Sequence, residues 1–341
     1  KAGLLSFFYL QGQALVDTVR VPVWASALDP RIHVFWIQPT RTGKTIAWEF
    51  IGEIAKLADL PIDMFTTGTD AALIGSFESV KEDDGSFTII QNPGLLAGGI
   101  CLNFDEGSIL LQANPKQFFS EVILYLQQAM NPIGSHSNTL TKHMKHGTIE
   151  TESRVSLWIT TFPPAGVKEY VLTKGLFQRV LLFYSPWSED MRQQGSEKRM
   201  SGVFKDMVSD KEPLDSLAQH FKDTRTKIEQ RLLKLTGTSA ADWVEKNDKE
   251  KEEVARQAMH EMFEISPDFW VCLDDSVDTY YTLIRGMDKG MSNVVCSFIP
   301  NILNYTVLFA VHLGILEIVS QDKDEFIITG DHVEMATEII Y

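Results

Sequence analysis

The chain has 341 residues and a net charge of -15, from 46 acidic and 31 basic side chains. This length suits about two domains, and an acidic surface argues against a protein that coats polyanions, so any contact with nucleic acid needs a local basic feature. The three cysteines, far apart in the chain, indicate neither a disulfide framework nor a zinc site and favour a reducing, cytoplasmic location.

From residue 31 to about residue 185, short β runs alternate with helical ones, a pattern typical of an α/β sheet domain. The apolar run at 99–104 predicts a central strand that is buried on both faces. A turn at Asp84-Gly85 predicts a hairpin that contains residues 85–90. The other predicted strands are 32–37, 62–67, 155–162 and 179–185, the last two also buried, and the predicted helices are 45–58, one beginning at Thr69-Asp70, and 115–130.

After Pro186 the sequence becomes helical and charged up to residue 266. The charge run at 242–253 predicts a solvated helix face, with a partner-binding tail as the alternative. Apolar helical patterns return from Pro267. The most apolar of them, residues 294–319, contains Pro300, two asparagines, a histidine and a glutamate, which predicts a buried helix pair and no membrane span.

A predicted strand runs directly into the sequence QPTRTGKT, which resembles the phosphate-binding motif G-x-x-x-x-G-K-[ST]. Only the first glycine is missing, and a proline at the second position still allows a tight exit from the strand. The motif predicts a loop that binds ATP, although a chance G-K-T is the alternative. The predicted nucleotide-binding residues are Gln38, Pro39, Thr40, Arg41, Thr42, Gly43, Lys44 and Thr45.

Within this loop each of the last three residues has an expected task. Gly43 is expected to have a positive φ, which lets the backbone amides face a phosphate group. Lys44 would reach the β- and γ-phosphates, and Thr45, at the start of the helix, would ligate Mg²⁺. The positive end of the helix dipole would favour the same anion.

A second predicted strand ends in two carboxylates, Asp105 and Glu106. With a phosphate loop upstream, Asp105 is expected to contact Mg²⁺ through water, and Glu106 is expected to act as the general base that activates the attacking water. A simple turn is the alternative. Thr160 and Thr161 end a third strand, where a hydroxyl can touch the γ-phosphate, and Arg179 is a candidate finger that neutralises transition-state charge in a neighbouring subunit.

The order of these motifs resembles that of hexameric P-loop helicases, above all MCM-type AAA+ motors and the ATPase domains of phage primase–helicase proteins. The resemblance covers about 31–185 and, more weakly, 280–341. It implies an α/β P-loop NTPase sheet of AAA+ or RecA-like type, with a helical insertion and a C-terminal helical lid-like domain. The corresponding divisions are a helical lead-in at 1–30, the ATPase core at 31–186, the charged helical region at 187–266 and the lid-like domain at 267–341.

The same resemblance implies a pre-sensor hairpin, whose tip lysine touches DNA in the central channel of the ring. Lys145 occupies that place, and with Lys142 and three nearby histidines it also forms a basic, loop-like segment in an otherwise acidic chain. Six copies in a ring would concentrate this charge around single-stranded DNA. No arginine corresponds to the one often found in the lid.

The expected function is therefore that of an ATP- and Mg²⁺-dependent, helicase-type DNA motor. It is expected to act as a homo-oligomer, a hexameric ring, in phage or mobile-element DNA replication in the host cytoplasm. Two alternatives stay open. Arg41 inside the loop also suits a DNA-packaging translocase, and the acidic surface suits a nucleotide-dependent switch or assembly protein that does not unwind DNA.

Overall fold

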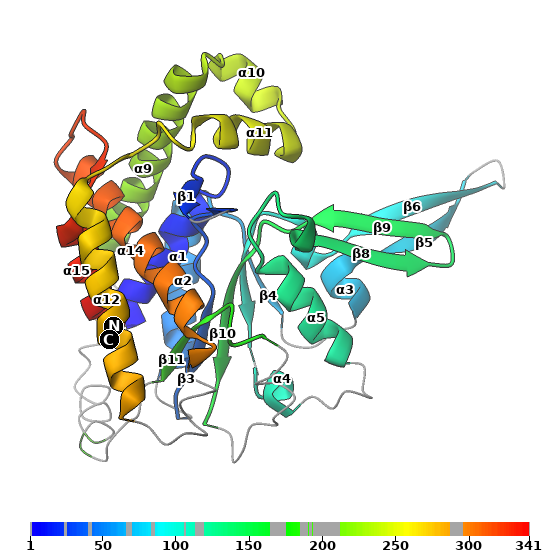
Figure 1. The fold of residues 1–341 in the computed structure, drawn as a ribbon. Helices are drawn as coiled ribbons and strands as arrows, with labels where there is room; N and C mark the ends of the chain where they lie inside the picture. Colours follow the sequence, from blue (N-terminus) through cyan, green and yellow to red (C-terminus); the bar gives the residue numbers. More distant parts are fainter. Residues whose placement is uncertain are drawn as a thin grey trace.

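The computed structural model describes residues 2–23, 26–39, 43–65, 70–82, 86–105, 107–112, 119–163, 175–184, 190, 193, 212–286 and 296–340. At its centre lies a parallel sheet of five strands in the order β11-β3-β10-β7-β4 (Figure 1). The bounds are β3 Val34–Ile37, β4 Ile62–Phe65, β7 Cys101–Phe104, β10 Ser156–Thr161 and β11 Leu181–Tyr184. The first of these strands along the chain, β3, therefore lies between the fourth and the fifth.

Helices cover both faces of the sheet because alternate residues of each strand point to opposite sides. Trp36 and Trp158 belong to the core on one face, with α1 (Ala2–Ala14) and α2 (Lys44–Leu57). Phe35 and Ile159 belong to the core on the other face. That second core also involves α3 (Asp70–Ile74), α4 (Ser108–Gln112) and α5 (Phe119–Ala129).

The inner strand β7 and the edge strand β11 differ in burial. Strand β7 is buried along its whole length, which confirms the prediction for residues 99–104. The prediction of a buried strand at 179–185 was wrong, because β11 is an edge strand of the described sheet. Leu182 and Tyr184 are 51% and 56% exposed there. An apolar run alone does not tell a central strand from an edge strand.

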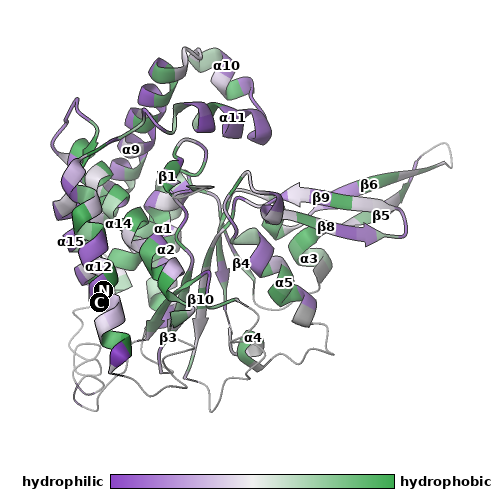
Figure 2. Cartoon of the chain, viewed as in Figure 1, coloured by the Kyte–Doolittle hydropathy of each residue, from purple (hydrophilic) through white to green (hydrophobic). Residues whose placement is uncertain are grey.

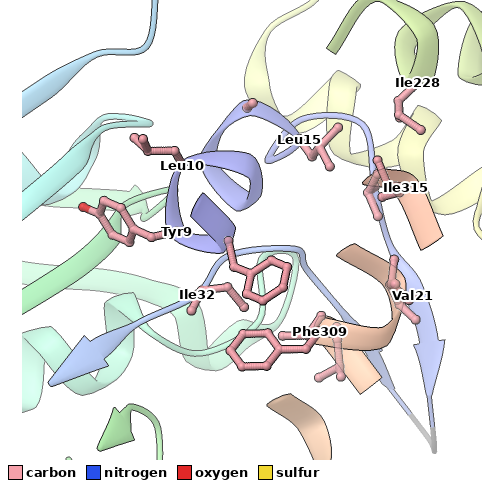
Figure 3. Packing of buried hydrophobic residues seen from close by; sticks show 14 of the residues in the cluster. Tyr9, Leu10, Leu15, Val21, Ile32, Ile228, Phe309 and Ile315 are labelled. Carbon is pink, nitrogen blue, oxygen red and sulfur yellow. The ribbon is translucent and has the colours of Figure 1, made fainter. Parts of the chain in front are cut away.

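Helix α14 (Ile299–Ser320) forms a second layer by packing against α1. The Phe8 and Phe309 rings stack with centroids 4.6 Å apart, in the cluster that Figure 3 shows. The predicted helix pair is a single helix within the described residues, because Pro300 lies in its first turn, where proline has no hydrogen bond to break. By length and composition α14 passes as a candidate membrane span, yet 61% of its most apolar window is buried in the protein.

Two β-hairpins project side by side from the second face of the sheet (Figure 1). One consists of β5 (Gly75–Lys81) and β6 (Phe87–Pro93), and the other of β8 (Thr139–Met144) and β9 (Gly147–Glu152). The predicted hairpin around 85–90 is confirmed by β6. The Phe77 ring fits against Gly147, where an added Cβ would lie 3.0 Å from it. Residues expected as a basic loop therefore form a strand and a turn.

The charged region contains α9 (Glu212–Thr236), α10 (Ala240–Glu245) and α11 (Asp248–Ala258). Asn247 begins α11 with a complete capping box. Figure 2 shows the polar surface of α11, on which Asp248, Lys249 and Glu250 are exposed. The charge run thus lies mostly on solvated helix faces, as predicted, except for Glu252, which is buried in an ion pair with Arg20. Helix α9 packs against α1, α2 and α14.

The remaining elements lie near the two ends of the described chain or connect strands of the sheet. A short hairpin follows α1, and a parallel pair joins the last helices. Their bounds are β1 Val21–Val23, β2 Ser26–Leu28, η1 Leu95–Ala97, η2 His136–Asn138, β12 Glu264–Ile265, α12 Pro267–Arg285, β13 Ile327–Ile328 and α15 Gly330–Ile340.

Candidate functional site

The GKT loop leaves the carboxyl end of β3 and leads into α2. Gly43 has φ 96° and ψ 11°, the left-handed conformation that was predicted for it. Lys44 is the first residue of α2, and Thr45 is exposed in its first turn. Thr40, Arg41 and Thr42 lie outside the described residues. The described end of the loop thus presents a lysine and a hydroxyl at a helix amino terminus, which is where an anion is favoured.

Lys44 folds back over the start of its own loop. Its ammonium group donates hydrogen bonds to the main-chain carbonyls of Gln38, at 2.6 Å, and Pro39, at 3.0 Å. The ammonium therefore lies above the backbone turn between β3 and α2, and both of these acceptors are neutral carbonyl oxygens. A phosphate group is a stronger acceptor for an ammonium ion than a carbonyl oxygen is.

The tip of β10 connects the GKT loop to the acidic loop. On one side, the amide of Gln38 donates to the carbonyl of Thr161 at 3.0 Å. On the other side, the amide of Gly107 donates to the carbonyl of Thr160 at 2.8 Å. Since neighbouring strands are about 4.8 Å apart, the ends of β3 and β7 lie about 10 Å from each other. The two predicted halves of the site therefore stand at the same edge of the sheet, one strand apart.

The two threonines at this tip differ in direction. The Thr160 hydroxyl donates a 3.0 Å hydrogen bond to Oδ1 of Asp105. The Thr161 hydroxyl donates to the carbonyl of Phe162 at 3.2 Å. Because residues two apart in a strand share a face, Thr160 points to the same side of the sheet as Trp158, which is the side that α2 covers. Of the two candidates, Thr160 is thus the one that lies with Asp105 and the lysine-bearing helix.

The acidic pair is described only in part. Asp105 follows β7, and its amide donates to the carbonyl of Phe65 at 3.2 Å. Glu106 lies outside the described residues. No group of three or more histidine, cysteine or carboxylate side chains suited to a metal occurs in the part of the chain that the structure describes. One carboxylate with one hydroxyl fits Mg²⁺ that is shared with a phosphate, because Mg²⁺ needs few protein ligands there.

Arg179 lies at the opposite edge of the sheet. It precedes the amino end of β11, whose Leu181 pairs with Val34 at the start of β3. At about 3.3 Å per residue, this places Arg179 about 20 Å below the loop at Gln38. The guanidinium group donates from Nε to Oδ1 of Asn131 and from a terminal nitrogen to the carbonyl of Gly175, both at 2.9 Å. Partial burial lowers the pKa of Arg179.

Beside Arg179 lies a polar cavity of about 360 Å³ at the same edge. Tyr305 closes one side of it, and its hydroxyl, which has one proton to donate, lies 3.1 Å from the carbonyl of His33 and 3.0 Å from the carbonyl of Arg179. Arg31 and Asp29 form a buried ion pair at 2.6 Å on another side. Sequence reasoning missed Asn131 and Tyr305, because neither residue belongs to a motif and their partners are remote in the chain.

The two predicted nucleic-acid lysines lie on the β8–β9 hairpin. Lys145 is exposed in the two-residue turn at its tip, and Lys142 is half-buried on β8. The neighbouring His143 ring is hydrogen-bonded to Thr148 at 2.9 Å. The most accessible positive charge of the hairpin is therefore at its end, far from the sheet.

Comparison with known proteins gives no family for this chain. No family model matches the sequence, and no curated protein matches it either. What is established is an α/β protein with a five-stranded parallel sheet and C-terminal helices.

Proposed function

We propose that this chain is a P-loop ATPase of helicase type that acts as a ring on single-stranded DNA. The observation that carries the proposal is the meeting of two loops at the tip of β10. The Gln38 amide bonds to Thr161 and the Gly107 amide to Thr160, with Asp105 held by Thr160 at 3.0 Å. Ligands of open α/β sheets bind at this carboxyl edge.

ATP would bind together with Mg²⁺, and the bond to its terminal phosphate would be hydrolysed. Residues of this chain would position the phosphates, the metal ion and the attacking water. Lys44 and the amides at the start of α2 would hold phosphate oxygens, with Lys44 exchanging its two carbonyl partners for them. Thr45 and Asp105 would hold Mg²⁺. Thr160 would orient Asp105, and Glu106 would accept a proton from the attacking water.

The place of Arg179 supports action between subunits. Some 20 Å of sheet, by the strand rise, separates it from its own GKT loop, so it cannot reach the phosphates of its own chain. A neighbouring copy that presents its carboxyl edge to this amino edge would receive the guanidinium group. A closed ring is the arrangement that gives every copy such a neighbour.

The β8–β9 hairpin supports the choice of nucleic acid as partner. It projects from the sheet and ends in the exposed Lys145, in a chain whose net charge is -15. If the copies of this hairpin point into the channel of a ring, their lysines would place positive charges around the negative DNA backbone. The acidic remainder of the surface would repel DNA elsewhere.

The test is ATP hydrolysis by the wild-type chain and by Lys44→Ala, each with and without a single-stranded oligothymidine. Lys56→Ala is the matched control, because Lys56 is an exposed lysine in the last turn of the same helix. We expect Lys44→Ala to abolish hydrolysis and Lys56→Ala to preserve it. Wild-type rates in Lys44→Ala would overturn the proposal. Hydrolysis that DNA does not stimulate would instead indicate a nucleotide-dependent switch.

A further inference from the structure

One side chain joins the β8–β9 hairpin to Arg179. The side-chain carbonyl of Asn131 accepts a hydrogen bond from Nε of Arg179 at 2.9 Å. The side-chain amide of the same residue donates to the main-chain carbonyl of Ser137 at 2.7 Å. Ser137 belongs to η2, which leads directly into β8.

The orientation of this amide is fixed by its partners. A guanidinium group only donates, and a main-chain carbonyl only accepts, so a flipped Asn131 would lose both bonds. The contact is also remote in sequence on one side, since 48 positions separate Asn131 from Arg179. Asn131 therefore bridges η2, at the root of the hairpin, and Arg179.

The root of the hairpin is held by hydrogen bonds of a buried side chain. Asn138 is fully buried, and its amide donates to the carbonyl of Asn131 at 2.6 Å. Its side-chain oxygen accepts from the amide of Ser153, at the far end of β9, at 2.8 Å. Both ends of the hairpin are thus fastened at the point where Asn131 lies. Asn131 therefore contacts the root of the hairpin through its main-chain carbonyl and through its side chain.

We propose that Asn131 is a positioning residue that couples the DNA-contacting hairpin to the arginine acting on the neighbouring subunit. When DNA moves the Lys145 tip, the hairpin turns about its root, Ser137 shifts Asn131, and Asn131 moves Arg179. The inference rests on the proposed function, because it assigns a regulator to the same ATPase site. It would explain how DNA at the tip of the hairpin stimulates hydrolysis at the carboxyl edge of the neighbouring subunit, which Arg179 faces.

The test compares Asn131→Asp with Asn131→Ala. The aspartate keeps an acceptor for Arg179 but sets a carboxylate oxygen against the Ser137 carbonyl, so only the hairpin bond is lost. We expect Asn131→Asp to hydrolyse ATP without DNA within about twofold of wild type and to lose its stimulation by oligothymidine. Asn131→Ala loses both bonds, and we expect kcat without DNA to fall about tenfold and oligothymidine to give no stimulation, while KM for ATP is unchanged.

The matched control is Asn92→Ala, which removes an asparagine hydrogen bond, to Glu78 at 2.9 Å, from the other hairpin. It should keep wild-type stimulation. If the carboxylate prevents folding, Asn131→Ser replaces it, because a serine hydroxyl is too short to span both partners and stimulation should fall likewise.

Two outcomes overturn the inference while the proposed function stands. One is full DNA stimulation in Asn131→Asp. The other is loss of oligothymidine binding in that variant, measured by fluorescence anisotropy, because Asn131 would then only maintain the hairpin. A wild-type chain that DNA does not stimulate would overturn the proposed motor function itself, whatever the variants do.

Discussion

The hydroxyl of Thr160 donates a 3.0 Å hydrogen bond to Oδ1 of Asp105, across the tips of two neighbouring strands. Strand β10 thereby holds a carboxylate whose own strand, β7, ends one residue earlier. Fifty-five positions separate the two residues in the chain. Their contact distinguishes Thr160 from Thr161, which the sequence places at the same tip without preference.

Replacement of Thr160 by valine keeps the shape of the side chain and removes its donor. Loss of a hydrogen-bond partner of a metal-binding carboxylate typically lowers metal affinity or activity by a factor of about 10 to 100. We therefore expect kcat to fall by that factor and the Mg²⁺ concentration that gives half-maximal activity to rise. The measurement is ATP hydrolysis over a range of Mg²⁺ concentrations. Thr161→Val is the control, and equal losses in the two variants would show that the Asp105 contact is not the cause.

A Gly43→Ala substitution tests the turn before Lys44. No atom of the described residues, the chain neighbours aside, lies within 4 Å of an added Cβ, so the expected cost is that of the left-handed backbone, about 1–2 kcal/mol of the free energy of unfolding. Gly237, with φ 66° and equally open surroundings, gives a matched control in Gly237→Ala. We expect similar losses of stability in denaturant titrations, but weaker ATP binding in Gly43→Ala alone. Unchanged ATP affinity in both variants would contradict a role for this turn.

Arg179 should act only on a neighbouring chain. We expect Arg179→Ala and Lys44→Ala to be inactive when assayed separately, with kcat of the arginine variant reduced about a thousandfold. Mixing the two should restore part of the activity, because some sites then combine an intact Lys44 with an intact Arg179.

The mixture is measured as ATP hydrolysis against the mixing ratio, with particle size recorded in parallel with and without ATP. A variant with both substitutions, mixed with Lys44→Ala, should recover nothing. If the chain stays monomeric with ATP, or if the mixture of single variants is as inactive as its parts, the arginine does not act between subunits.

Two buried histidines predict a loss of stability in mild acid. Burial lowers the pKa of His33 to about 3 and that of His312 to about 4. In the unfolded chain each histidine takes up its proton near the ordinary pKa of about 6.5. The stabilisation from keeping these histidines neutral is therefore fully present above about pH 6.5 and is lost as the pH falls toward the folded pKa values. Between about pH 6.5 and about pH 5 each histidine should lower the free energy of unfolding by about 2 kcal/mol.

The check is chemical denaturation at about pH 7 and about pH 5. His312→Gln is the informative variant, since a glutamine amide can still donate to the Pro30 carbonyl, which the ring nitrogen now contacts at 2.9 Å, and does not titrate. It should lose about 2 kcal/mol less than wild type over this range. Equal pH dependence in both proteins would show that His312 takes up no proton on unfolding. Asp29, whose pKa is lowered by Arg31 against the effect of burial, titrates below this range and does not contribute.

The sequence was sufficient to predict the positions of the strands and the local backbone conformation of Gly43. Apolar runs bounded by turns identified the five strands, and Gly43 was expected in the left-handed conformation that it adopts. These features depend on neighbours in the chain. The edge position of β11 and the packing of one hairpin against the other depend on remote partners, and no local pattern specifies them.

The same distinction applies to the candidate site. The sequence predicted a site at residues 38–45 and Asp105, and the common edge of its described parts follows from parallel strands, while ligand binding there stays a prediction. The preference for Thr160 over Thr161 and the bridge through Asn131 could not be predicted, because each depends on register and side-chain direction across about 50 intervening residues. Glu106 and Thr40, Arg41 and Thr42 lie outside the described residues, and their roles stay predictions.

The packing of α14 on α1 has a consequence for synthesis of the protein. Roughly 300 residues lie between these two helices, and translation at about 5–20 residues per second needs about 15–60 s to produce them. During that time Phe8 lacks the ring of Phe309, and Gln11 lacks its hydrogen bond of 3.1 Å to the carbonyl of His312. Helix α14 can therefore pack on α1 only after most of the chain has been synthesised. Until then the apolar surface of α1 is exposed to water or bound by a chaperone.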